Sequence, residues 1–118
     1  MVKAIALLRK KAGISREEMI AYYETRHAPL VLSLLPQIAG YRRSYPLSEG
    51  AFLPLGAELG FDVMTELRFA SRADYEGFLT RAGQPEVAQA IADDEENFLD
   101  RSATRMVVVE EHGGDRAG

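Results

Sequence analysis

The order of the strand-like and helix-like segments constrains the fold of this chain more than any other feature of its sequence. Four short segments have the apolar or alternating pattern of strands: residues 2–8, 41–46, 61–70 and 104–110. Segments with the start signals and the spacing of helices follow the first strand and the third strand. The order strand, helix, strand, strand, helix, strand predicts a four-stranded antiparallel sheet with both helices on one face.

This β-α-β-β-α-β order is that of ferredoxin-like folds, so we predict an α+β protein. Its first helix is expected over residues 15–27, because Ser15 and Glu18 have the spacing of a capping box. Pro29 is expected to end or kink this helix near His27, because proline lacks the backbone donor that a helix interior needs.

One face of such a sheet has no helix to cover it. The strands contribute apolar residues to both faces whichever way they are phased, among them Ile5, Leu7, Met106 and Val107. Two apolar faces and a single helical layer imply a partner for the bare face. We therefore expect a homodimer in which the two sheets pack face to face.

The size and composition indicate one globular domain. The chain has 118 residues, and we expect a single domain over residues 1–112 and a flexible, glycine-rich tail over residues 113–118. It has no cysteine, which excludes disulfides, cysteine nucleophiles and thiolate metal sites. This composition suits a reducing compartment, and we expect the protein to be cytoplasmic.

Charge and hydropathy argue against nucleic-acid and membrane partners. The formal net charge is −4, whereas nucleic-acid binding usually needs a basic face. No apolar run approaches the ~20 residues that span a bilayer. The basic residues of the opening MVKAIALLRKK follow its apolar stretch, which is the reverse of a signal peptide.

Several short motifs together resemble a known family. They are G-I-S-R-E-E-M, Y-Y-E-T-R-H-A-P-L, D-E-E-N-F-L-D and the strand V-V-V-E-E. With these motifs the chain resembles the EthD family of the dimeric α+β barrel superfamily over residues 2–111, and H-A-P-L and F-L-D are the most specific parts. The resemblance implies a ferredoxin-like fold that dimerises through its sheets. Similar proteins include isomerases of lactones, cyclases, decarboxylases and cofactor-independent monooxygenases, and family labels lean toward oxidoreductase.

His27 is the first candidate for a catalytic role. The other histidine, His112, lies in the predicted tail, and imidazole is the side chain that exchanges a proton near neutral pH. Tyr23 lies one helical turn before His27 and could assist it, and Asp100 could orient the imidazole or hold an arginine. The alternatives are a buried histidine that ends a helix and a loop aspartate that accepts backbone hydrogen bonds.

Five further residues are candidates for substrate binding. Tyr41 and Arg43 share one face of the second strand, and Glu66 and Arg68 share one face of the third. Phe98 could form a wall of a pocket. The alternatives are an ordinary cross-strand ion pair for the charged residues and simple packing for Phe98.

No motif in the sequence predicts a metal site or a cofactor site. The histidines have no metal-binding spacing, and the glycines form neither a phosphate loop nor a dinucleotide fingerprint. We therefore expect an enzyme without cofactors that acts by proton transfer on a small hydrophobic substrate, aromatic, polyketide-like or lactone, with the apolar loop 47–60 excluding water. The alternative is a non-catalytic protein that binds such a molecule for a partner oxygenase.

Overall fold

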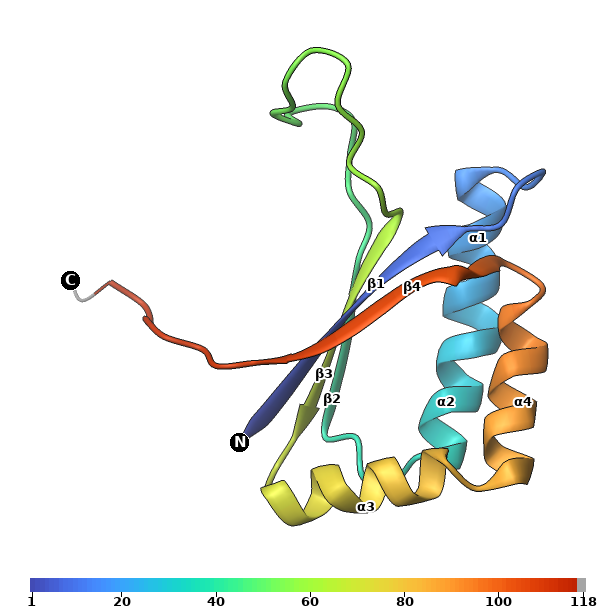
Figure 1. Ribbon diagram of the computed structural model, residues 1–118, viewed down its shortest axis with the longest axis vertical. Coiled ribbons are helices and arrows are strands. Elements are labelled where there is room, and N and C mark those ends of the chain that lie inside the picture. The colour runs from blue at the N-terminus through green and yellow to red at the C-terminus, as the bar shows by residue number, and fades with distance from the viewer. Residues whose placement is uncertain (117–118) are drawn as a thin grey trace.

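The computed structural model describes residues 1–116 of the chain, and its elements follow the predicted order (Figure 1). The strands are β1 (Val2–Lys10), β2 (Gly40–Ser44), β3 (Val63–Phe69) and β4 (Leu99–Val109). The helical elements are α1 (Arg16–Tyr22), the π-helical turn η1 (Tyr23–His27), α2 (Ala28–Leu34), α3 (Arg72–Ala82) and α4 (Pro85–Glu95). The strands pair antiparallel in the order β2-β3-β1-β4. The predicted α+β, ferredoxin-like fold is confirmed.

The first helix begins where the sequence predicts. The backbone N–H of Glu18 donates to Ser15 Oγ at 3.0 Å, and Glu18 Oε1 accepts from the backbone N–H of Ser15 at 3.0 Å. This capping box satisfies two backbone donors that the first turn of a helix leaves without partners.

The same helix does not stop near His27, the first of the two outcomes expected of Pro29, but its regular winding is interrupted there. The chain passes from α1 through η1 directly into α2. In η1 the N–H of Ala28 donates to the carbonyl of Tyr23, a wider turn than that of an α-helix. Pro29 then occupies the first turn of α2, a position that tolerates its missing N–H.

The end of the chain also differs from the expectation. β4 begins at Leu99 rather than at residue 104, and its pairing with β1 shifts register between Leu7, which pairs with Arg105, and Arg9, which pairs with Asp100. The acidic run 93–96 overlaps the end of α4, which continues to Glu95. This run therefore lies at the last turn of a helix that packs over the sheet.

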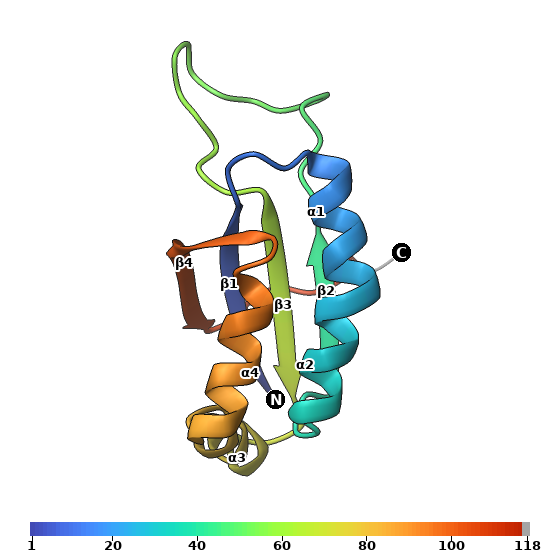
Figure 2. The ribbon, with the colours of Figure 1, turned by 90° about the vertical axis from the view of Figure 1, so that its right-hand side faces the viewer.

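The side chains of β3 alternate between the two faces of the sheet. The buried ones are Val63, Thr65, Leu67 and Phe69. The apolar residues among them pack with the helices in two adjoining clusters, and Figure 2 shows α1, α2 and α4 in front of this face. We call the other face, which no helix of residues 1–116 covers, the open face. The register places Ile5, Leu7, Met64 and Val107 together on it.

The segment between β2 and β3 extends beyond the end of the sheet (Figure 1). Phe52 and Leu55 in this loop are almost fully exposed. Within residues 1–116 no helix has the length and apolar character needed to cross a membrane.

Candidate active site

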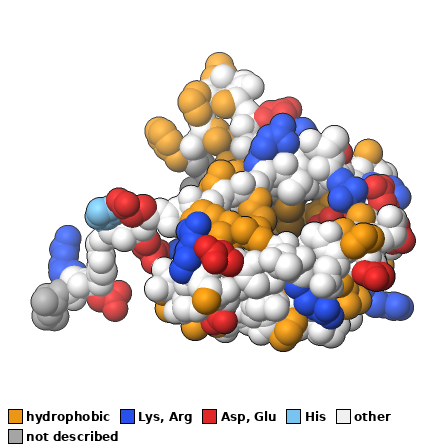
Figure 3. Space-filling view, turned by 60° about the horizontal axis from the view of Figure 1, so that its bottom comes forward, with side chains coloured by type: hydrophobic (Ala, Val, Ile, Leu, Met, Phe, Trp, Pro, Cys, Tyr) orange, Lys and Arg blue, Asp and Glu red, His pale blue; other side chains and the backbone are white. Residues whose placement is uncertain are grey.

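A cavity of about 300 Å³ lies between the helix-covered face of the sheet and α2, α3 and α4. Figure 3 shows a hollow surrounded by hydrophobic side chains. Aliphatic side chains from five elements contribute to its wall: Leu8, Val31, Leu35, Leu67, Ile91 and Met106. Its polar lining consists of Tyr23, His27, Tyr41, Thr65, Glu95, Arg101 and Thr104. A volume at the low end of the range for ligand sites suits a small, mainly apolar molecule.

A second depression, of about 550 Å³, lies beneath the loop between β2 and β3. It is lined by loop residues together with Arg16 and Asp62, and no histidine or tyrosine is among its lining residues. Because it brings no acid–base pair together, the candidate chemistry lies in the first cavity.

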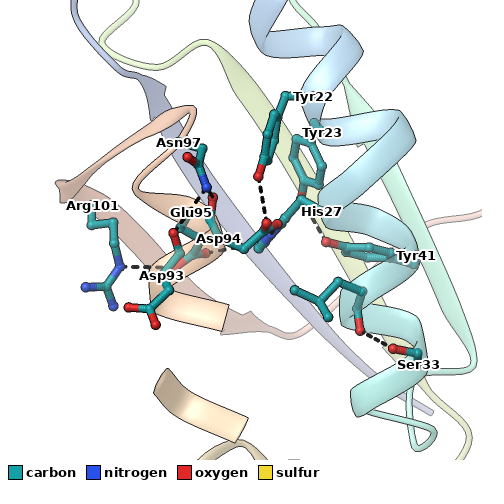
Figure 4. A network of polar contacts seen from close by, with 11 residues as sticks. Tyr22, Tyr23, His27, Ser33, Tyr41, Asp93, Asp94, Glu95, Asn97 and Arg101 are labelled. Atoms are coloured by element: carbon teal, nitrogen blue, oxygen red, sulfur yellow. Dashed lines mark hydrogen bonds and ion pairs between the residues drawn. The ribbon is translucent and has the colours of Figure 1, made fainter. Parts of the chain in front are cut away.

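His27 lies at the cavity and is held by α4. Its side chain is 3% exposed, and Nδ1 lies 2.7 Å from Oδ2 of Asp94 (Figure 4). A carboxylate can only accept, so the Nδ1–H donates, and in the neutral ring Nε2 is then the acceptor nitrogen. Tyr22 donates to the other oxygen of Asp94 at 2.7 Å, which fixes the carboxylate in place. The buried imidazole is therefore held in one orientation by Asp94, and Asp94 is held in turn by Tyr22.

A second carboxylate lies on the other side of the imidazole ring. Oε2 of Glu95 is 3.7 Å from Nε2 of His27, and Oε1 of Glu95 accepts from Nε of Arg101 at 3.1 Å. This ion pair joins α4 to β4 at the cavity. No group of His, Asp and Glu side chains within residues 1–116 has the arrangement needed to hold a metal ion.

Three hydroxyl groups form a chain on the sheet side of the cavity. Tyr23 Oη is 2.7 Å from Thr65 Oγ1 and 2.9 Å from Tyr41 Oη. Burial raises the pKa of Tyr23, and burial together with the neighbouring Tyr23 raises the pKa of Tyr41. Both phenols therefore keep their protons at neutral pH and act as hydrogen-bond donors.

Phe98 supports the site from behind. It is fully buried, and its ring centroid lies 4.9 Å from that of His27 and 5.2 Å from that of Tyr23. Tyr22 stacks on it at 5.1 Å. Phe98 is not part of the cavity wall, so its role in the structure is to pack beneath the catalytic candidates.

Asp100 does not lie beside His27. Its Oδ1 accepts from the backbone N–H and the hydroxyl of Ser102, and its register partner on β1 is Arg9. The reason is the early start of β4, which carries Asp100 along the strand and away from η1. The carboxylate that orients the imidazole is Asp94 instead.

Arg43 points toward the helices but not into the cavity. Its guanidinium makes two hydrogen bonds to Glu24, at 2.7 and 2.9 Å, and lies 4.9 Å from the ring of Tyr41. Tyr45 donates to the same carboxylate at 2.6 Å. These contacts tie η1 to β2 and hold the Tyr41 ring, and the Arg43 hydrogen bonds lower the pKa of Glu24.

Glu66 and Arg68 lie on the open face. Glu66 pairs with Lys3 at 2.6 Å, and Arg68 packs against Gly40 and contacts Met1. They are one position out of phase with Thr65 and Leu67, so the pleat turns them away from the cavity. Of the binding candidates, the structure brings Tyr41 alone to the cavity wall.

Comparison with known proteins agrees with this architecture. The family model described as EthD domain matches residues 11–102 of the chain. The chain belongs to the EthD domain family. The comparison with curated proteins gives no match.

Solved structures share the fold of this EthD protein at low sequence identity. An EthD family protein from Bacillus halodurans has 20% identity and a TM-score of 0.65, with 95% of this chain and 99% of that chain covered. An EthD-like protein from Ralstonia eutropha has 23% identity and a TM-score of 0.60, with 92% and 86% covered. A dimeric protein of unknown function with a ferredoxin-like fold, from Bacteroides fragilis, has 14% identity and a TM-score of 0.57, with 93% and 95% covered.

Asp94, Glu95, Arg101 and Thr65 of this EthD protein were not predicted as site residues. A signal for two of them exists in the sequence. Asp94 and Glu95 follow the apolar Ile91 by three and four residues, so they share its face of α4. Ile91 and Glu95 line the cavity, and Asp94 reaches His27 beside it.

Proposed function

We propose that this EthD protein is an enzyme without cofactors that transfers protons on a small hydrophobic substrate, with His27 as the acid–base group. The single observation that carries the proposal is the buried imidazole, whose Nδ1 is held by Asp94 and whose ring borders an apolar cavity. A structural histidine needs neither a dedicated carboxylate nor a cavity. Isomerisation, cyclisation, decarboxylation and cofactor-free oxygenation each begin or end with such a proton transfer.

The geometry supports a defined sequence of proton movements. Nε2 of neutral His27 accepts a proton from a C–H or O–H group of the substrate. The imidazolium that forms is stabilised by Asp94 at Nδ1, and it returns the proton to another atom of the substrate. Such a positioned group contributes typically 10²–10⁴-fold to a rate.

The apolar walls have a role in this chemistry. Val31, Leu35 and Ile91 exclude water from the side of the cavity formed by the helices. A dry site strengthens the interaction between the imidazolium and the two carboxylates beside it. The loop between β2 and β3 does not contribute, because none of residues 47–60 lines this cavity.

We also propose that the protein acts as a homodimer through the open face of its sheet. Ile5, Leu7 and Val107 on this face are apolar and lie next to one another in the register. Val107 is 58% exposed in the protomer. With no cysteine, the chain depends on no disulfide, which supports the cytoplasm as its place of action.

A non-catalytic role in carrying a small hydrophobic molecule is the second candidate. The predominance of aliphatic side chains in the cavity wall favours it, because such a wall binds without reacting. This role needs the cavity but not a proton acceptor at His27.

The two roles are separated by following deuterium uptake from heavy water into a panel of small aromatic and lactone compounds, with NMR detection. The wild type and His27→Gln are compared, and His112→Gln is the control because His112 is exposed in the C-terminal segment. We expect His27→Gln to lower the uptake by about 100-fold or more, with unchanged thermal unfolding and with binding retained. Equal uptake in His27→Gln and the wild type contradicts the proposal. Binding by both without uptake by either supports the carrier role.

A further inference from the structure

The hydroxyl chain formed by Thr65, Tyr23 and Tyr41 has one proton more than its internal hydrogen bonds use. Each hydroxyl has one proton, and the chain contains two hydroxyl–hydroxyl contacts, at 2.7 and 2.9 Å. Each contact uses one proton. The proton that neither contact uses belongs to Tyr41, to Thr65 or, if both of these donate to Tyr23, to Tyr23 itself.

The direction of the chain follows from burial. Tyr23 is 1% exposed and Thr65 is 2% exposed, whereas Tyr41 is half-buried and lines the cavity. In the part of the chain that the structure describes, the hydroxyl of Tyr41 has Tyr23 as its one hydrogen-bond partner. The arrangement that leaves no buried proton without an acceptor runs from Thr65 to Tyr23 to Tyr41 and ends at the cavity.

At the other end of the cavity, the charged lining residues Glu95 and Arg101 already form an ion pair with each other. Asp94 and Glu95 lie on either side of the imidazole, and Glu96 follows them. Arg101 is the one Lys or Arg side chain among the described residues of the cavity lining, and it already contacts Glu95 and Glu96, at 3.1 and 3.9 Å. A carboxylate on a ligand would therefore meet like charge without a free cation to neutralise it.

A cationic ligand is also disfavoured. An ammonium group donates hydrogen bonds but cannot accept one, so it would leave the proton of Tyr41 without an acceptor. Its alkyl skeleton would fit the aliphatic walls, but its charge would lose water beside Leu67 and Val31.

We propose that the cavity binds a neutral carbonyl compound whose oxygen accepts a hydrogen bond from the hydroxyl of Tyr41, and that it rejects the carboxylate and the ammonium of the same skeleton. The inference rests on the proposed function and names its substrate class. When both hold, the C–H bond next to the carbonyl breaks and its proton moves to Nε2 of His27. The electron pair forms a C=C bond, and the carbonyl oxygen takes the negative charge under the hydrogen bond from Tyr41.

The test uses four probes that share one bicyclic skeleton: α-tetralone, tetralin, α-aminotetralin and tetralin-α-carboxylate. Their dissociation constants for the full chain are measured at neutral pH by calorimetry and ligand-observed NMR. We expect α-tetralone to bind about fivefold more tightly than tetralin, the value of one net hydrogen bond. The amine and the carboxylate should each bind at least about tenfold more weakly than the ketone. Equal affinity for ketone and hydrocarbon, or for ketone and carboxylate, overturns the inference.

Variants test which hydroxyl donates the hydrogen bond to the carbonyl oxygen of the ligand. Tyr41→Phe should abolish the preference for α-tetralone over tetralin, so that the two dissociation constants become about equal. The substitution removes the donor that accounts for the fivefold preference. Tyr45→Phe is the matched control, because it removes a phenol that bonds to Glu24 outside the cavity. Thr65→Val should retain the preference, because the proton of Tyr23 still passes to Tyr41. Loss of the preference in Thr65→Val but not in Tyr41→Phe would place the donor at the opposite end and overturn the assignment. If Tyr41→Phe does not fold, the four affinities of the wild type still decide the ligand class.

These binding experiments are independent of turnover, so the two proposals can fail separately. Deuterium uptake by the wild type without a preference for the ketone overturns the inference and leaves the proposed function intact. A preference for the ketone without uptake of deuterium into any compound leaves the inference intact and contradicts the proposed function.

Discussion

Asp94 Oδ2 lies 2.7 Å from Nδ1 of His27 although 67 residues separate them in the sequence. The contact joins the end of α4 to the π turn that follows α1, and Tyr22 completes it by donating to the second oxygen of the same carboxylate. The orientation of the imidazole therefore depends on how two helices pack together.

Asp94→Asn tests whether this carboxylate positions His27. The amide removes the charge that stabilises the imidazolium and can reverse the donor and acceptor roles at Nδ1. We expect turnover to fall by about 10- to 100-fold, as for other partners that orient a functional histidine, while KM stays within about twofold. The nitrogen chemical shifts of the His27 ring should report a change in its tautomer, which a purely structural role would not cause.

The packing beneath the site is tested with two phenylalanines. Phe98 is fully buried against Tyr22, Tyr23 and His27, whereas Phe52 is 97% exposed. Phe98→Ala should lower the free energy of unfolding by about 3–5 kcal/mol, because it leaves a large cavity. Phe52→Ala should change it by no more than about 0.5 kcal/mol. Urea unfolding measures both, and equal effects would contradict the packing described for Phe98.

The stability of the fold should fall at alkaline pH. Burial raises the pKa of Tyr41 above its ordinary value of 10.0, so the folded state holds the phenol proton more tightly than the unfolded state does. The stabilisation is complete below about pH 10 and is lost as the pH rises, by at most about 1.4 kcal/mol per pH unit for one group. Urea unfolding between pH 8 and about 11.5 should therefore show a slope that Tyr41→Phe reduces. An unchanged slope in the variant would contradict the role of burial.

The proposed dimer is tested with two variants, one that places a charge on the open face and a control that places a charge on α3. Val107 lies on the open face and is 58% exposed, and Leu79 on α3 is 48% exposed. Val107→Asp should convert the dimer into a monomer, because it would bury an unpaired carboxylate between the sheets. Leu79→Asp should leave the dimer intact. Sedimentation velocity measures both, and a monomeric wild type at micromolar concentration would refute the dimer.

The fold could be predicted because its signals are local. The capping box of Ser15 and Glu18 marks the start of the first helix, and the alternation in β3 identifies the buried face. The sequence left open whether Pro29 ends or kinks this helix, because the π turn that places the proline at a tolerated position has no local signal. The starting point of β4 was missed because the residues after the buried Leu99, from Asp100 to Ser102, are polar and half-exposed or exposed, so they do not have the apolar pattern of a strand.

The candidate site could be predicted only in part. His27, Tyr23 and Tyr41 lie together at the cavity. His27 was predicted because histidine is rare in this chain, and Tyr23 because it lies one helical turn before His27. Asp94 was not predicted, since its role depends on a contact with a residue that is distant in the sequence. Asp100 was placed wrongly because a shift in the β1–β4 register decides where that strand carries its side chains.

The π turn of Tyr23–His27 also constrains how such a site can change. Around a regular α-helix, steps of four residues drift by about 40° each, and a single wider turn offsets that drift. Tyr23, His27, Val31 and Leu35, each four residues after the last, therefore all reach one cavity. Loss of a single codon from residues 24–26 would restore regular winding and rotate α2 against the sheet. A descendant of this protein could therefore lose the proposed acid–base group by point substitution far more easily than it could straighten this helix, because its hydrophobic core depends on the same extra residue.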